Sequence, residues 1–261
     1  MVNKSLSWDA KLYQNSSSLQ FELGLMGIDK LNPNGSEKIL EIGCGNAMLT
    51  IELAKKNLNG SITAIEISED MISQARTNIS KTNLTNIKLI HENAIQIDYK
   101  DEFDAIYSNS AIHWIINLEL MYEKIYHALK QNGRILIQTG LRSMNPLVKS
   151  IYELVALKKY RNVLSEFKSP WRYLTTEETY ELLDSLCFRN VNVEVFDHLL
   201  KYDTEKAMLN YFRSATLVPF YTIIPIELKE EFTNDLREIY LKNNENRLEV
   251  ESKRLFISAI K

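Results

Sequence analysis

Residues 38–47, KILEIGCGNA, decide the fold of this chain. The first five form a short apolar run typical of a buried strand, and two glycines separated by one residue follow at once. Glycine lets the backbone turn sharply and lets a ligand approach it without a Cβ in the way. A strand that runs through such a turn into a helix is typical of nucleotide-binding α/β folds.

The same alternation of strand and helix continues outward from this segment. Apolar or alternating runs predict strands at 38–42, 61–67, 87–91, 103–108, 134–139, 191–196 and 255–260, and amphipathic patterns predict helices at 49–56, 71–81, 118–129 and 180–186. Strands joined by helices favour right-handed crossovers and a sheet covered on both faces. We therefore predict an α/β fold: a doubly wound, seven-stranded, mostly parallel, Rossmann-like sheet with a helical cap.

Three regions are expected within this one domain. Residues 1–35 are predicted as an N-terminal helical lid, 36–141 as the nucleotide-binding core, and 142–261 as a substrate-binding cap with the last two strands. Residues 199–254 carry most of the cap, because their pattern is mainly helical and rich in Tyr, Phe and Leu. Ser68 is predicted to cap the helix at 71–81, and Thr175 with Glu178 to form a capping box.

The composition favours small-molecule chemistry. The chain has 31 basic and 34 acidic residues, a net charge of −3, and no long run of one sign, so neither nucleic acid nor an anionic membrane is expected as a partner. No export signal or membrane span is visible, and the widely separated Cys44 and Cys187 fit a reducing compartment, so a cytoplasmic location is expected. No metal-ligand spacing occurs, and the oligomeric state is left open.

Glu66 ends the second predicted strand, just over twenty residues beyond Gly43. A carboxylate there can accept hydrogen bonds from both hydroxyls of a ribose, which predicts an adenosine-containing ligand. Alternatively, Glu66 is a polar residue at a strand end and the glycines form only a tight turn. Met48 replaces the third glycine of a dinucleotide fingerprint, and no plausible Tyr-x-x-x-Lys pair follows the fourth strand. A nicotinamide-dependent oxidoreductase is therefore the second hypothesis, and a non-catalytic binding module the third.

The pattern Glu41-x-Gly43-x-Gly45 resembles motif I of the class I S-adenosylmethionine-dependent methyltransferases, and the resemblance extends over nearly the whole chain. It implies S-adenosyl-L-methionine as the cofactor and residues 36–141 as its binding core. Glu66 looks like the ribose-binding acid, and Asn93 stands where many members have Asp. The implied cofactor-binding residues are Tyr13, Ser17, Gln20, Glu41, Gly43, Cys44, Gly45, Glu66, Ile67, Met71, Asn93, Ala94, Ser108 and Asn109.

Residues 108–114, SNSAIHW, follow the fourth predicted strand, where the family binds its acceptor. The segment lacks the Asn/Asp-Pro-Pro-Tyr/Phe pattern of base-amino methyltransferases. Its Ala-x-x-Trp form is similar to the trans-aconitate, malonyl-carrier-protein and juvenile-hormone-acid carboxyl methyltransferases. The resemblance therefore implies a small-molecule methyltransferase, with O-methylation of a carboxylic acid as the leading prediction.

Four residues are candidates for handling the acceptor: His113, Trp114, Arg172 and Arg213. A carboxylate acceptor is already ionised and needs orientation, which arginine can provide through two parallel hydrogen bonds, with His113 as a positioning donor. An amine, phenol or hydroxyl must lose a proton, and His113 would then be the general base. The remaining interpretation is a half-buried histidine that only satisfies a backbone carbonyl.

Overall fold

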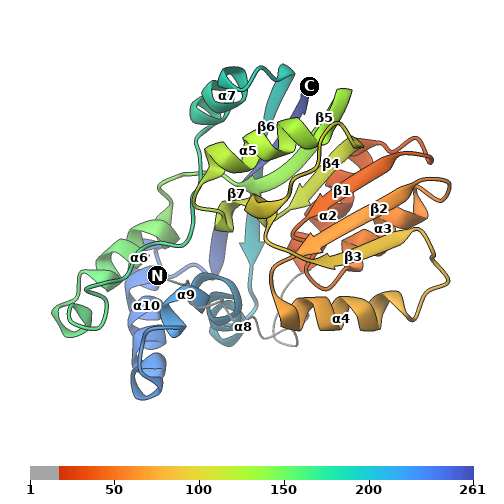
Figure 1. The fold of residues 1–261 in the computed structure, drawn as a ribbon. Coiled ribbons are helices and arrows are strands. Elements are labelled where there is room, and N and C mark those ends of the chain that lie inside the picture. The colour runs from red at the N-terminus through yellow and green to blue at the C-terminus, as the bar shows by residue number, and fades with distance from the viewer. Residues whose placement is uncertain (1–17) are drawn as a thin grey trace.

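The computed structural model describes residues 18–261, which contain one seven-stranded sheet of order β3-β2-β1-β4-β5-β7-β6 (Figure 1). Strands β1 to β5 are parallel, and β7 pairs antiparallel with both β5 and β6. The strands are β1 (Lys38–Ile42), β2 (Ser61–Glu66), β3 (Ile87–His91), β4 (Phe103–Asn109), β5 (Leu129–Gly140), β6 (Arg189–Lys201) and β7 (Glu249–Ile260). The prediction of a doubly wound, mostly parallel sheet is confirmed.

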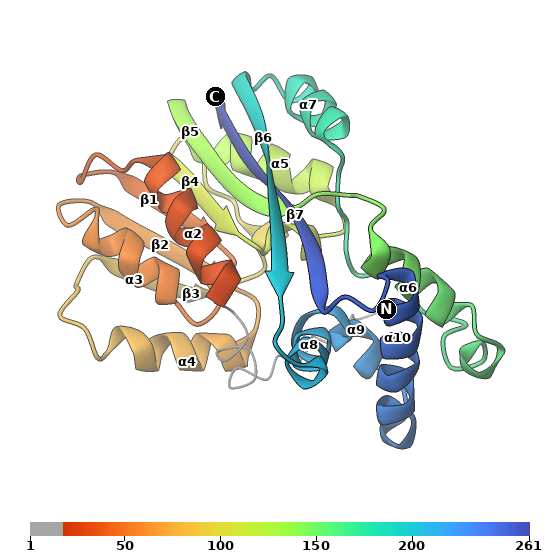
Figure 2. The same cartoon turned by 180° about the vertical axis from the view of Figure 1, so that it is seen from behind.

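Helices cover both faces of this sheet. The helices of residues 18–261 are α2 (Ser18–Leu31), α3 (Met48–Lys55), α4 (Glu69–Ile79), α5 (Leu118–Ala128), α6 (Pro146–Val155), α7 (Thr176–Ser185), α8 (Glu205–Tyr211), α9 (Val218–Tyr221) and α10 (Lys229–Asn243). In Figure 1 α5 lies in front of the sheet, and Figure 2 shows α2 and α3 on the other face.

Alternation along β1 produces these two layers. Leu40 and Ile42 join a buried cluster with the apolar side chains of α5, whereas Ile39 joins a second cluster with those of α2 and α3. Because β1 pairs with both β2 and β4, all of its neighbours are strands, and it lies in the middle of the parallel part of the sheet. Its carboxyl end, where the glycine turn begins, is therefore held from both sides.

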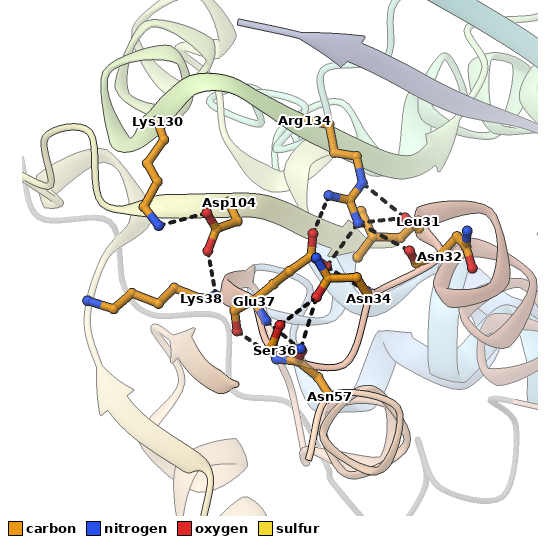
Figure 3. Close-up of polar contacts among 10 residues, drawn as sticks. All are labelled: Leu31, Asn32, Asn34, Ser36, Glu37, Lys38, Asn57, Asp104, Lys130 and Arg134. Atoms are coloured by element: carbon orange, nitrogen blue, oxygen red, sulfur yellow. Dashed lines mark hydrogen bonds and ion pairs between the residues drawn. The ribbon is translucent and has the colours of Figure 1, made fainter. Parts of the chain in front are cut away.

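A partly buried ion pair fixes the opposite end of β1 (Figure 3). Arg134 on β5 donates to both carboxylate oxygens of Glu37, at 2.6 and 3.0 Å, and also to the carbonyl of Leu31 at the end of α2. The backbone N–H of Glu37 donates to Asn57 at 2.9 Å. These bonds join α2, β1, β5 and the end of α3 at the edge of the sheet remote from the glycine turn.

The predicted helix caps are confirmed. The hydroxyl of Ser68 accepts from the N–H of Met71 at 3.4 Å, at the start of α4. Thr175 and Glu178 form a capping box at the start of α7, with bonds of 3.2 and 2.9 Å. Both are local arrangements that the order of residues alone specifies.

The extent of the cap was predicted too generously. β6 runs to Lys201 and β7 begins at Glu249, so residues 199–201 and 249–254, expected in the helical cap, belong to strands. Their ladder hydrogen bonds do not depend on apolar residues, and several charged side chains face outward, which hides the strand pattern. Helices α6, α8, α9 and α10 pack around a separate apolar cluster. Figures 1 and 2 both show these helices together at one end of the sheet.

The region predicted as an N-terminal lid is only partly described. Helix α2 packs on the sheet, with Leu19 and Leu23 against Phe256 of β7. Tyr13 and Ser17, predicted at the cofactor, lie outside the described residues. Among the helices of residues 18–261, none combines the length and apolar character needed to cross a membrane.

Candidate active site

The glycine turn after β1 lies against the turn after β4. Gly43 has φ +74°, and a Cβ added to it would lie 2.2 Å from Cβ of Ala111. Gly45 has φ +55°, and an added Cβ would meet nothing within 4 Å. The first glycine is therefore required by packing within the protein, whereas the second borders open space where a ligand can approach the backbone.

The carboxylate of Glu66 is held beside this turn. One oxygen accepts the N–H of Gly45 at 3.0 Å, and the other accepts the N–H groups of Ile67 and Ser68, each at 2.9 Å. A carboxylate offers about four acceptor positions, so the group retains capacity for a further donor. Glu66 is thus oriented in advance at the carboxyl end of β2.

The residues predicted around an adenine ring lie beyond Glu66. Ile67 is 58% exposed although it is a large apolar side chain, and Met71 on α4 is buried. Asn93 uses its side-chain oxygen to accept the N–H of Ile95 at 3.2 Å, which caps a short 3₁₀ turn that begins at Ala94. The exposed Ile67 is the apolar surface available to a flat ring here.

Three buried side-chain oxygens near the turn have no hydrogen-bond partner within the described chain: Oε1 of Gln20, Oε2 of Glu41 and Oδ1 of Asn109. Unpaired buried acceptors cost free energy, so each of these oxygens is available to a donor from a ligand. Burial raises the pKa of Glu41 to about 7; the hydroxyl of Thr50 opposes this shift and the charge of Glu66 adds to it. These atoms, with the open side of Gly45, fit a polar ligand that carries hydrogen-bond donors.

Two other predicted cofactor residues are engaged within the protein. The hydroxyl of Ser108 donates to the carbonyl of Ile42 at 2.9 Å, and the amide of Asn109 donates to the carbonyl of Gln20 at 3.0 Å. Burial raises the pKa of the Cys44 thiol well above its usual value, so this side chain is a packed thiol and not a nucleophile. These contacts hold the ends of β1, β4 and α2 together.

His113 lies on a short 3₁₀ turn, Ile112–Trp114, that follows β4. It is 5% exposed, its Nδ1 lies 3.1 Å from the hydroxyl of Thr139, and its ring stacks on Tyr173 at 4.9 Å. Burial lowers its pKa to about 3, assisted by the positive charge of Arg254. The imidazole is therefore neutral at neutral pH. Gly140 makes room for this arrangement, since a Cβ there would lie 2.5 Å from the Tyr173 ring.

A cavity of about 750 Å³ opens between the carboxyl ends of β4 and β5 and the cap. Gln20, Ser110 and His113 line it on the side of the core, and its walls are otherwise mainly apolar. The apolar lining residues are Trp114, Leu141, Leu147, Val148, Ile151, Val155, Phe167, Trp171, Leu174, Ala215 and Phe220. Trp114 packs against Trp171 with ring centroids 5.7 Å apart. Such a volume suits a small organic molecule.

The two predicted arginines are both paired with acids. Arg172 lines the cavity, but its guanidinium donates to Glu119 at 2.5 Å. Arg213 donates to both carboxylate oxygens of Glu230, at 2.9 and 3.0 Å, and is not among the residues that line the cavity. The structure therefore does not bring Arg172 and Arg213 together around one acceptor group.

A third arginine was missed. Arg254 lies on β7 opposite Gly140 of β5 and lines the cavity. Its Nε donates to the hydroxyl of Ser252 at 3.0 Å, and it forms no ion pair with an acid of residues 18–261. The sequence pattern placed position 254 in the helical cap, so nothing connected it to the site. The signal that could have revealed the strand is the alternation of residues that begins at Glu249.

Comparison with known proteins agrees with the class that this fold and glycine turn define. The family model described as "Methyltransferase domain" matches residues 33–207, and the chain belongs to this family. The chain is 28% identical over 234 residues to malonyl-[acyl-carrier protein] O-methyltransferase of Priestia megaterium, covering 86% of this chain and 81% of that one. It is 24% identical over 271 residues to juvenile hormone acid O-methyltransferase of Drosophila melanogaster, covering 97% and 89%.

A solved structure shows the same fold with the cofactor. Phosphoethanolamine N-methyltransferase 2 of Haemonchus contortus, in complex with S-adenosyl-L-methionine, matches with a TM-score of 0.64 at 16% identity, over 97% of this chain and 56% of that one. The protein is thus an S-adenosylmethionine-dependent small-molecule methyltransferase. This settles the choice against the oxidoreductase and the non-catalytic module.

Proposed function

We propose that this methyltransferase transfers the methyl group to the carboxylate of a small carboxylic acid. The observation that carries the proposal is the state of His113, which is buried and neutral with a pKa of about 3. A group that binds a proton so weakly is a poor general base, since an effective base has a pKa near the working pH. An acceptor that is already ionised needs no base, and a carboxylate meets this condition.

In this proposal the cofactor binds at the glycine turn after β1, beside Glu66. Glu66 would accept the ribose hydroxyls, Ile67 and Met71 would contact one face of the adenine, and Asn93 with Ala94 would border its edge. The unpaired oxygens of Gln20, Glu41 and Asn109 are suited to bind an ammonium group. When bound, the cofactor supplies a methyl group that is already activated by its attachment to a sulfonium.

The chain's own task is then alignment and exclusion of water. The acceptor oxygen forms the new bond to the methyl carbon as the carbon–sulfur bond breaks, and no proton has to leave. His113, held by Thr139 and stacked on Tyr173, would orient the acceptor, with Trp114 as part of the wall. The two relatives named for O-methylation support this proposal, each at under 30% identity.

The experiment is methyl transfer from labelled S-adenosylmethionine to three matched acceptors: decanoic acid, decylamine and 4-octylphenol. The proposal expects the acid to be methylated and the other two to remain unlabelled. Transfer to the amine or the phenol alone would contradict it and would favour the alternative in which His113 removes a proton.

A further inference from the structure

Four basic residues line the cavity between the core and the cap, and three of them are neutralised by acids. Arg142 pairs with Glu178 at 2.5 Å, Arg172 with Glu119 at 2.5 Å, and Lys253 with Asp197 at 3.5 Å. The fourth, Arg254, has no ion-pair partner in the described chain. Exposed pairs such as these contribute little to stability, but each one satisfies a charge that would otherwise attract an anion.

The guanidinium of Arg254 is held by a hydrogen bond at Nε, whereas its two terminal nitrogens are available to a ligand. Nε donates to Ser252 at 3.0 Å, whereas the two terminal nitrogens form no hydrogen bond within residues 18–261. They therefore keep the two parallel donors with which arginine binds a carboxylate. Glu251 also lines the cavity, but it forms no ion pair with Arg254.

Aromatic rings from three different segments surround this charge. Arg254 is the strand partner of Gly140, the ring of Tyr173 packs over Gly140, and His113 stacks on Tyr173 at 4.9 Å. In keeping with this arrangement, the positive charge of Arg254 lowers the pKa of His113 and opposes the burial that raises the pKa values of Tyr173 and Tyr211. All three residues line the same cavity. The cation is therefore close to His113 and is partly shielded from water, which strengthens its attraction for an anion.

The wall of the cavity on the side of the cap is largely apolar. Leu147 and Ile151 of α6, Phe167 and Trp171 of the following loop, and Phe220 of α9 form apolar walls. A ligand that fits both features has a negative head and an apolar body.

From this juxtaposition we propose that Arg254 binds the carboxylate of the acceptor, and that the acceptor is a monocarboxylic acid with an apolar chain or ring system. The inference rests on the proposed function, because it names the acceptor class of the same site. It replaces the sequence-based assignment of that role to Arg172 and Arg213, whose guanidinium groups bind Glu119 and Glu230.

Calorimetric titration of the full chain with hexanoate, decanoate, tetradecanoate and the uncharged decanol, in the presence of S-adenosylhomocysteine, tests the assignment. Arg254→Gln is expected to weaken carboxylate binding by about 10- to 100-fold and to leave decanol binding unchanged, and Arg254→Lys is expected to fall between. Arg189→Gln, at the start of β6 where the guanidinium bonds Asn132, is the matched control and should bind like the wild type.

Unchanged affinity for S-adenosylhomocysteine and an unchanged Tm show that the Arg254→Gln chain is folded. Equal loss of decanoate and decanol binding, or equal affinity of Arg254→Gln and wild type for decanoate, would overturn the assignment, as would failure of the wild-type chain to bind any of the three acids. Arg254-dependent binding without methyl transfer would uphold the binding site and contradict the proposed function. If Arg254→Gln methylates acids with the wild-type KM, the proposed function is upheld and the assignment of Arg254 is contradicted.

Discussion

The carboxylate of Glu66 accepts the backbone N–H of Gly45 at 3.0 Å, so the acid that ends β2 and the turn that follows β1 form one unit. This bond orients Glu66 before any ligand arrives, which reduces the ordering cost of binding.

Glu66→Ala is therefore expected to weaken binding of S-adenosylhomocysteine by about 1 to 3 kcal/mol, because the bonds to the ribose are lost and the turn is loosened. Isothermal titration calorimetry measures this directly. Glu52→Ala, on the exposed side of α3, is the control and should bind normally; a Glu66→Ala chain that binds equally well would remove Glu66 from the site.

Substitutions of Gly43 and Gly45 are expected to weaken cofactor binding for different reasons. Gly43→Val should abolish cofactor binding and destabilise the chain, because even a Cβ would lie 2.2 Å from Ala111. Gly43→Ala combined with Ala111→Gly should recover part of the lost Tm, since the added Cβ then has room.

Gly45→Ala is expected to fold, at a cost of about 1 kcal/mol for its left-handed backbone, because no protein atom lies within 4 Å of the new Cβ. It should nevertheless lose affinity for S-adenosylhomocysteine. Thermal unfolding combined with calorimetry separates the two effects, and wild-type affinity in Gly45→Ala would show that the ligand does not approach this glycine.

Glu41 should make stability depend on pH. The pKa of Glu41 is about 7 in the folded chain, above its ordinary value of 4.5. Between pH 4.5 and pH 7 the folded chain therefore keeps a proton on Glu41 that the unfolded chain has lost. The stabilisation that comes from this proton is fully present below pH 4.5 and is lost as the pH rises through 7. The difference in free energy of unfolding between Glu41→Gln and the wild type should grow by about 3 kcal/mol over this window. Urea unfolding at several pH values measures it, and a constant difference would contradict the assigned pKa.

His113→Asn is expected to lower kcat for an acid acceptor by about 10-fold or less, because an amide can still bond Thr139 but lacks the ring that stacks on Tyr173. Between about pH 6 and about pH 9 the wild-type kcat/KM should show no ionisation of a histidine. A general base would instead cost about 100- to 10,000-fold when removed, with a pH limb that disappears in the variant.

The core of the site could be predicted from sequence because its parts are local. The glycine turn needs specific backbone angles, Glu66 ends a strand, and caps such as Thr175 with Glu178 lie within one helical turn. Each is therefore visible in a few consecutive residues.

The acceptor pocket could not be predicted in this way. Arg254 lines the same cavity as His113 and Tyr173 only because β5 pairs antiparallel with β7 and because the loop before α7 passes over Gly140. Arg172 and Arg213, the two arginines predicted from the sequence, form ion pairs with Glu119 and Glu230, which come from other elements. Packing between distant segments decides which arginine is available.

The most direct test of the central claim is the chemical nature of the transferred label. After incubation of the wild-type chain with labelled S-adenosylmethionine and an apolar monocarboxylic acid, the product is treated with mild base. A methyl ester is expected, and it would release the label as volatile methanol. A product whose label resists base would place the methyl group on nitrogen, carbon or an ether oxygen, and would contradict carboxylate methylation.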